Sequence, residues 1–170
     1  MKLVKIKNLI AITIIALLWS CSYSFTGSSV PPHLNTIAIP IVKDKSGSGE
    51  PNLSSDFTQN LTEQFFDENS LQVVNSINSD AILIVTILSM PERTEVVSGE
   101  NEKATERRIT INAKVVYKDL VLKKTIFDKR ISNYATFDAS ENYTTNRQDG
   151  IERAIEQVGL DILLAVVADW

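Results

Sequence analysis

Residues 81–90 read AILIVTILSM, a nearly continuous apolar run that ends at Pro91. The length of this run and its β-branched residues predict a central β-strand that is buried on both faces. A buried helix is the alternative interpretation of the same run. Further strands and helices are indicated on both sides of it.

Downstream of the central run, two segments indicate a β-hairpin. Residues 109–117 alternate between apolar and mostly polar side chains, which is the pattern of a half-buried strand. Residues 119–123 then form a turn, and residues 124–137 form the second strand. The residues expected on one face of this second strand are Phe127, Ile131 and Ala135. The polar residues 91–105 between the central run and the hairpin predict a mobile loop.

Upstream of the central run, the sequence indicates a strand, a helix and a further short strand. Residues 36–42 read TIAIPIV, and Pro40 must lie at an edge or at a locally unpaired position because proline has no N–H to donate. After a loop at residues 43–50, an apolar residue recurs at every fourth position, which predicts an amphipathic helix. The apolar stripe of this helix consists of Leu53, Phe57, Leu61 and Phe65. Residues 71–74 are consistent with a short strand.

The C-terminal residues 147–168 predict a second amphipathic helix. Its apolar stripe consists of Ile151, Ala154, Ile155, Val158, Ile162 and Val166. Gly150 and Gly159 each cost about 1 kcal/mol in a helix relative to alanine, which indicates close packing or a bend. Two amphipathic helices and one apolar sheet predict an α+β two-layer sandwich. We expect both helices on one face of a mostly antiparallel or mixed four-stranded sheet.

The first 20 residues predict a secretory signal peptide. Three lysines precede an apolar stretch at residues 9–19, which is too short to span a bilayer as a helix. Residues 18–21 read LWSC and resemble the lipobox of bacterial lipoproteins, in which the cysteine carries a diacylglycerol and an N-linked acyl chain such as palmitate. Cys21 is therefore the predicted lipidation site, and Ser22 after it favours the outer membrane. The alternatives are an ordinary signal peptide with a chance cysteine and a buried free cysteine.

The expected organisation is a signal peptide at residues 1–20, a lipidated tether at 21–35 and a single α/β sandwich domain at 36–170. The tether contains apolar residues that could dock on the domain, which are Tyr23, Phe25 and Val30. Cleavage before Cys21 would remove three lysines and no acid, so the formal net charge would change from −4 to −7.

The composition argues against several kinds of function. One cysteine cannot form an intramolecular disulfide, and one cysteine with one histidine cannot form a zinc site of the Cys/His type. The Ser-Gly-Ser-Gly sequence at residues 46–49 lacks the Gly-Lys-Ser/Thr ending of a phosphate loop and is followed by the acidic Glu50. His33, the single histidine, lies in the tether, where a catalytic triad is not expected. We therefore expect no catalytic residues, no metal and no cofactor apart from the lipid on Cys21, and no nucleic-acid partner.

Basic residues cluster locally in the predicted hairpin despite the acidic total. Lys114 and Lys118 could share a face with some of them, which would give a basic strip suited to the phosphates of an anionic partner or glycolipid. The alternative is a solvated sheet edge, where lysine blocks edge-to-edge pairing. The candidate ligand-binding residues are Arg107, Arg108, Lys129 and Arg130.

Several short motifs resemble the LptE family of lipopolysaccharide-assembly lipoproteins, in particular the branch found in Bacteroidota. The matching segments are residues 21–27, 31–33, 36–40, 49–51 and 107–111, together with the closing Ile-Leu sequence and Trp170. At residues 25–27 the sequence lacks an arginine that proteobacterial members usually carry. The resemblance extends over essentially the whole chain after the signal peptide.

The resemblance implies an α/β sandwich that is anchored in the inner leaflet of the outer membrane and faces the periplasm. It also implies that the protein partners the β-barrel LptD as plug and assembly factor and that it binds lipopolysaccharide. No family motif covers the four basic candidates, so they are assigned on charge alone. The predicted charge of −7 would restrict attraction to a local basic patch.

Residues 37–47 also resemble the opening of CsgG-like and penicillin-binding-protein-activator lipoproteins. These proteins belong to other functional classes, namely secretion pores and activators of peptidoglycan synthases. A pore former should contain additional long amphipathic strands, and none is evident here. This resemblance remains the alternative interpretation of the sequence.

Overall fold

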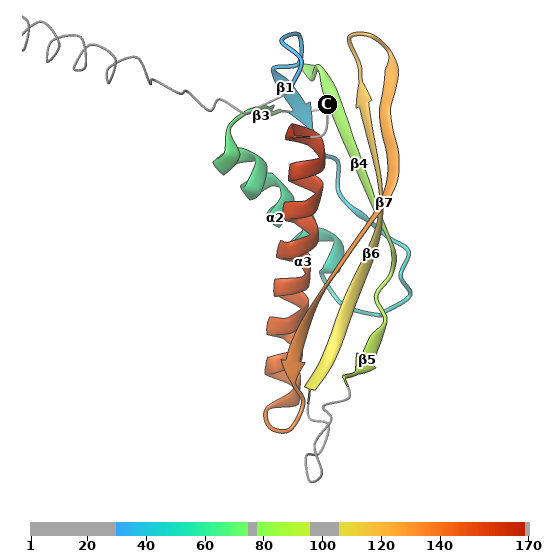
Figure 1. The fold of residues 1–170 in the computed structure, drawn as a ribbon, viewed down its shortest axis with the longest axis vertical. Coiled ribbons are helices and arrows are strands. Elements are labelled where there is room, and N and C mark those ends of the chain that lie inside the picture. The colour runs from blue at the N-terminus through green and yellow to red at the C-terminus, as the bar shows by residue number, and fades with distance from the viewer. Residues whose placement is uncertain (1–29, 75–77, 96–105, 169–170) are drawn as a thin grey trace, which may run out of the picture.

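The computed structural model describes residues 30–74, 78–95 and 106–168, which form an α+β fold (Figure 1). Its elements are β1 (Thr36–Ala38), β2 (Lys43–Asp44), α2 (Leu53–Glu68), β3 (Gln72–Val73), β4 (Ala81–Ser89), β5 (Glu92–Thr94), β6 (Glu106–Asp119), β7 (Lys124–Asp138) and α3 (Tyr143–Val167). The signal peptide and the lipidation site predicted from the sequence lie outside the described residues. Within those residues, neither helix is long and apolar enough to cross a membrane.

The strands form one mixed, seven-stranded sheet with the order β3-β1-β4-β6-β5. In addition, β2 pairs with β4 and β7 pairs with β6. β1 and β2 run parallel to β4, whereas β6 runs antiparallel to its three partners. The class predicted from the sequence is confirmed, but the expected number of four strands is wrong. The short strand expected at residues 71–74 is present as β3, whereas β2 and β5 are only two and three residues long and carry no readable periodicity.

β4 is the central strand predicted from residues 81–90, but it is buried on only one face. Its buried residues are Ala81, Leu83, Val85 and Ile87, and the residues between them are half-buried. Both helices cover the same face of the sheet (Figure 1), so the other face has no helical layer. The prediction of burial on both faces is therefore wrong, because a run of apolar residues does not reveal how many layers cover it.

The predicted strand at residues 36–42 is interrupted at Pro40. β1 ends at Ala38, β2 begins at Lys43, and both pair with β4. Pro40 thus occupies the locally unpaired position that was one of the two expected possibilities. β1 before it lies between β3 and β4, whereas β2 after it pairs with β4 alone. Part of the predicted loop at 91–105 is also ordered, since β5 pairs with β6.

The two helices supply the second layer of the sandwich. The stripe predicted for α2 is confirmed, since Leu53, Phe57, Leu61 and Phe65 are all buried. α3 begins at Tyr143 rather than at Arg147 as predicted, and its first turn is closed by a 3.0 Å hydrogen bond from Asn146 N–H to the Asn142 carbonyl. Residues 143–146 are largely polar and lack the apolar stripe, so the pattern begins one turn later than the helix.

Both helical glycines mark close packing, as the sequence indicated. A Cβ atom on Gly150 would lie 3.3 Å from the Phe137 side chain and 3.4 Å from Ile109 Cδ1, both on the sheet. A Cβ atom on Gly159 would lie 2.6 Å from Asn60 Oδ1 and 2.9 Å from Gln64 Nε2, both on α2. Gly150 therefore brings α3 close to the sheet, and Gly159 brings it close to α2.

Candidate functional site

The structure distributes the four predicted basic residues over both faces of the β6–β7 hairpin. Successive residues of a strand point to opposite faces, so Arg107 and Arg108 separate, as do Lys129 and Arg130. Arg107 and Lys129 share the side that the helices cover, as the burial pattern of each strand indicates. Arg108 and Arg130 share the open face with Lys114 and Lys118. The four residues therefore do not form one continuous basic strip.

Arg107 belongs to an ion-pair network at the end of the sheet where β5 pairs with β6. Its Nε lies 2.9 Å from Glu92 Oε1, and its guanidinium lies 5.9 Å from the Tyr143 ring centroid. Glu92 also accepts hydrogen bonds from the Tyr143 hydroxyl at 2.8 Å and from Arg147 Nε at 2.9 Å. Arg147 Nη1 in turn lies 2.6 Å from Glu50 Oε1. This network connects the loop before α2 to β5, β6 and α3.

The charges in this network are mutually satisfied. Burial alone would raise the pKa of the Glu92 carboxyl, but the hydrogen bonds from Arg147 and Tyr143 and the two nearby guanidinium charges bring that pKa below its usual value. Burial alone would lower the pKa of Arg147. The contacts of Arg147 with Glu92 and Glu50 outweigh that effect, so the pKa of Arg147 is raised. Arg107 is thus committed to an intramolecular contact, which weakens its candidacy as a ligand-binding residue.

Arg108 is also engaged within the protein. Its Nη2 donates to Glu95 Oε1, and its guanidinium lies 4.0 Å from the Tyr134 ring centroid in a cation–π contact on the open face of the sheet. Lys114, on the same face, lies 3.1 Å from Asp128 Oδ2 and is paired in register with Arg130. The open face is therefore a mixture of paired charges.

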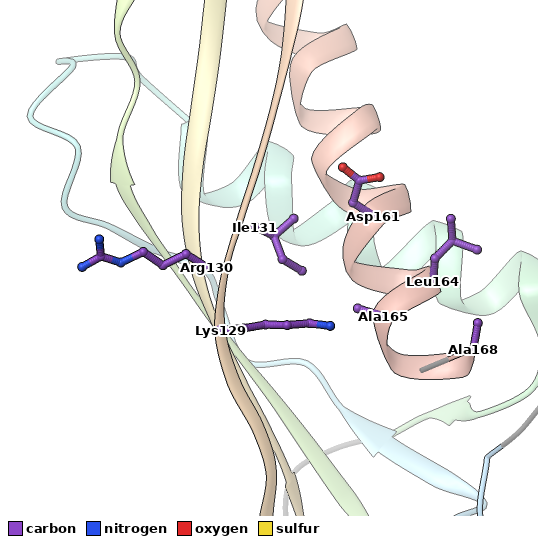
Figure 2. Close-up of a pocket in the computed structure, with 7 residues that line it drawn as sticks. All are labelled: Lys129, Arg130, Ile131, Asp161, Leu164, Ala165 and Ala168. Carbon is purple, nitrogen blue, oxygen red and sulfur yellow. The ribbon is translucent and has the colours of Figure 1, made fainter. Parts of the chain in front are cut away.

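Lys129 lies in a groove of about 510 Å³ between β7 and the C-terminal half of α3 (Figure 2). Its side chain points toward α3, whereas the neighbouring Arg130 points away from the groove. The Lys129 Nζ lies 4.6 Å from the Phe127 ring centroid. The groove is also lined by Arg130, Ile131, Asp161, Leu164, Ala165 and Ala168. A cation beside apolar side chains suits an amphiphile that carries both a phosphate and a hydrocarbon chain.

Asp119 is a buried acid that the sequence interpretation placed only in a turn. Its Oδ2 lies 2.7 Å from His33 Nε2, its Oδ1 accepts from Leu122 N–H at 2.7 Å, and it is 1% exposed. Burial alone would raise the pKa of Asp119, but the hydrogen bonds from His33 and Leu122 and the charges of His33 and Lys124 bring it below its usual value. The residue could not be identified from the sequence because His33 is 86 positions away.

The beginning of the described chain is held beside this turn. Asp80 Oδ2 accepts hydrogen bonds from Asn35 N–H at 3.0 Å, from Thr36 N–H at 3.0 Å and from the Thr36 hydroxyl at 2.9 Å. The Asn35 backbone bond and then the Thr36 hydroxyl make the largest contributions that lower the pKa of Asp80. Leu34 is buried in the core, and Val30 packs against it, as expected for a tether residue that docks on the domain.

Among the described residues, no group of three or more histidine, cysteine, aspartate or glutamate side chains is arranged to hold a metal ion. Glu50, which follows the Ser-Gly-Ser-Gly sequence, contacts Arg147. The principal features of the surface are thus a groove with a cation and a histidine–aspartate pair that fixes the N-terminal segment.

The fold defines a small α+β protein with the architecture of bacterial lipoprotein domains. Protein XCC0632 from Xanthomonas campestris superposes with a TM-score of 0.56 at 11% identity, covering 82% of this chain and 91% of the other. A minor lipoprotein from Acinetobacter baumannii gives a TM-score of 0.53 at 12% identity, with coverages of 80% and 94%. At such low identity these similarities support the fold alone.

The chain belongs to the LptE family, described as lipopolysaccharide-assembly, whose model matches residues 34–166. The family resemblance found in the sequence motifs is therefore confirmed. No curated protein sequence gives a significant match to this chain. The family match begins at Leu34 and ends at residue 166, so it spans every described strand, all of α2 and all but the last residue of α3.

Proposed function

We propose that this protein is an outer-membrane lipoprotein that partners an LptD-type β-barrel as plug and assembly factor in lipopolysaccharide transport. The observation that carries the proposal is the match of the LptE family model to residues 34–166. The role is one of binding and assembly, without catalysis. It requires an anchor, a barrel partner and a surface for an anionic glycolipid.

The anchor in this proposal is Cys21, which lies nine residues before the first described residue, Val30. A fully extended chain of nine residues spans about 30 Å, so the domain would stay close to the periplasmic face of the outer membrane. A diacylglycerol with a further N-linked acyl chain provides stable attachment, because each buried CH₂ contributes about 0.8 kcal/mol.

The glycolipid surface in this proposal is the groove that contains Lys129. Its lysine can bind a phosphate, and Ile131, Leu164 and Ala165 offer an apolar wall for an acyl chain. Of the two basic candidates at this groove, Lys129 is the one whose side chain points toward α3 (Figure 2). Arg107 and Arg108 contact Glu92 and Glu95, and Lys129 contacts the Phe127 ring, so each of the three would exchange an intramolecular contact for the ligand.

A paired experiment tests the proposed function. The lipidated chain is purified from outer membranes by an affinity tag, and the gene is depleted in a parallel culture. Recovery of a large outer-membrane β-barrel and accumulation of lipopolysaccharide in the periplasm would support the proposal. Recovery of a peptidoglycan synthase, or of a homo-oligomeric ring, would instead favour the activator or secretion-pore alternative. Cys21→Ser provides the control, because it should abolish fractionation with the outer membrane.

A further inference from the structure

The β6–β7 turn exposes three consecutive apolar side chains. Leu120, Val121 and Leu122 are 38%, 51% and 55% exposed, respectively. Single exposed apolar residues are normal on a protein surface, whereas turns usually consist of polar residues and glycine. Within the residues that the structure describes, no other position has three exposed large apolar side chains in succession. Its composition makes the turn a candidate contact surface.

Lysines surround the same turn. Lys118, Lys123 and Lys124 line a groove of about 270 Å³ together with Asp119, Leu120 and Thr125. The acid in this groove, Asp119, is 1% exposed and paired with His33, so it contributes little negative charge to the surface. A chain with an excess of acids thus presents a local cationic patch around an apolar tip. Lysine next to exposed apolar side chains matches the phosphate and hydrocarbon layers of an anionic bilayer surface.

The turn is held in an outward orientation by its own hydrogen bonds. Asp119 Oδ1 accepts from Leu122 N–H at 2.7 Å, and Leu120 N–H donates to the Asp80 carbonyl at 2.7 Å. Lys123 adopts a left-handed backbone conformation with φ 54°, which closes the turn into β7. These contacts use the backbone and the acid, so the three apolar side chains remain available for contact with a partner.

The turn lies at the same end of the molecule as the first described residues, which follow the proposed lipid anchor in the sequence (Figure 1). The pairing of His33 with Asp119 holds the start of the described chain against this turn, and both lie at the same end of the molecule (Figure 1). Val30 lies nine positions after Cys21, a maximum span of about 30 Å. This step rests on the proposed anchoring at Cys21.

We propose that the β6–β7 turn is a membrane-docking tip. Leu120, Val121 and Leu122 insert into the interfacial region of a bilayer, and the adjacent lysines bind the phosphate groups of anionic phospholipids. The tip and the lipid anchor would then hold the domain at two points and fix its orientation on the membrane. A protein surface is the other class of occupant, and the experiment below separates the two.

The test uses the lipidated full chain reconstituted into phosphatidylethanolamine–phosphatidylglycerol vesicles without any other protein. Val121→Cys is labelled with an environment-sensitive fluorophore, and Gln148→Cys, which is exposed near the start of α3, serves as the matched control position. We expect the probe at position 121 to show a blue-shifted emission and to be quenched by spin-labelled lipids, while the probe at 148 stays in water. A probe at 121 that remains in water in these vesicles would overturn the proposal, as would one that leaves water only when a barrel protein is added.

A second pair of variants tests the role of charge. Lys123→Gln with Lys124→Gln should reduce lipid quenching of the probe at 121, since each lysine near an anionic surface contributes about fivefold to partitioning. Lys43→Gln with Lys45→Gln removes the same charge at exposed positions near β2 and should leave the quenching unchanged. Equal effects of the two pairs would contradict headgroup binding at the tip.

Failure of the anchor can be recognised separately. Cys21 is the single native cysteine, so a chain lipidated there does not react with the fluorophore before a new cysteine is added. Labelling of the parent chain would show that Cys21 is not lipidated and would refute the proposed anchor. Sedimentation of that unlipidated chain with anionic vesicles, and its loss in Val121→Ser with Leu122→Ser, would still support the tip. Absence of sedimentation would refute the tip as well.

Discussion

His33 Nε2 lies 2.7 Å from Asp119 Oδ2, which joins the first described segment of the chain to the turn between β6 and β7. The aspartate is 1% exposed, whereas the histidine side chain is 35% exposed. A buried carboxylate depends strongly on its hydrogen-bond partners, because loss of one partner leaves part of the charge without compensation. The pair therefore holds the first described residues against the β6–β7 turn and supports that turn.

Asp119→Asn should lower the free energy of unfolding at pH 7 by about 1–3 kcal/mol, because the charged hydrogen bond to His33 is lost. The pKa of Asp119 lies below its usual 3.8 in the folded protein, so its contribution is complete above that pH and disappears as the pH falls through the folded value. Urea unfolding of both chains from pH 7 to pH 3 measures this effect. If the free energy of unfolding of Asp119→Asn differed from that of the parent chain by the same amount at pH 7 and at pH 3, this pH dependence would be refuted. Asp149→Asn, at an exposed position, is the control.

Glu92→Gln should destabilise the protein by about 1–2 kcal/mol, because Arg107 and Arg147 both lose their shared carboxylate. Glu50→Gln should have a smaller effect, since Glu50 contacts Arg147 and Arg147 keeps its hydrogen bond to Glu92. Thermal unfolding of the two variants provides the comparison. High salt should reduce the difference for Glu92→Gln, and a salt-independent difference would contradict an ionic origin.

Gly150→Val should destabilise the protein by about 1–3 kcal/mol, because its side chain would press against the buried Phe137 and Ile109. Gly159→Ala should change the stability by less than about 1 kcal/mol, since the Asn60 and Gln64 side-chain ends can rotate away while alanine improves helix propensity. Denaturant midpoints of the two variants test the contrast. A larger loss in Gly159→Ala than in Gly150→Val would show that the contact with α2 is the rigid one.

Lys129→Glu should weaken lipopolysaccharide binding at least about tenfold if the ligand occupies the groove between β7 and α3. Arg130→Glu reverses an adjacent charge that points away from that groove, so it should have little effect. Displacement of a fluorescent lipopolysaccharide measures both variants, and circular dichroism confirms their folding. A larger loss in Arg130→Glu would assign the ligand to the open face of the sheet instead.

Local patterns were sufficient for much of the fold. The four-residue spacing of Leu53, Phe57, Leu61 and Phe65 identified α2, and the alternation along β6 identified its buried face, because each pattern follows from the geometry of a single element. The start of α3 was missed because residues 143–146 lack apolar periodicity. β5 was missed because three residues acquire strand geometry only through pairing with β6.

The candidate site was only partly predictable. The sequence singled out Arg107, Arg108, Lys129 and Arg130 as cations of one hairpin, but neighbouring residues on a strand necessarily diverge to opposite faces. Distant segments also give these residues different surroundings, since Glu92 contacts Arg107 and α3 forms a groove beside Lys129. The apolar composition of the turn at residues 120–122 was visible in the sequence, whereas its exposure was not.

The sequence by itself indicated the family, the two amphipathic helices and the long hairpin, while lipidation at Cys21 stays a prediction. The helices and the hairpin follow from patterns among residues that are close together in the chain. The tertiary structure alone decided that one face of the sheet is covered, that seven strands pair and that His33 reaches Asp119 across 86 positions. These features depend on contacts between segments far apart in the chain. The periodicity of apolar residues shows which side of a helix or strand is apolar, but only the packing of the folded chain determines what that side contacts.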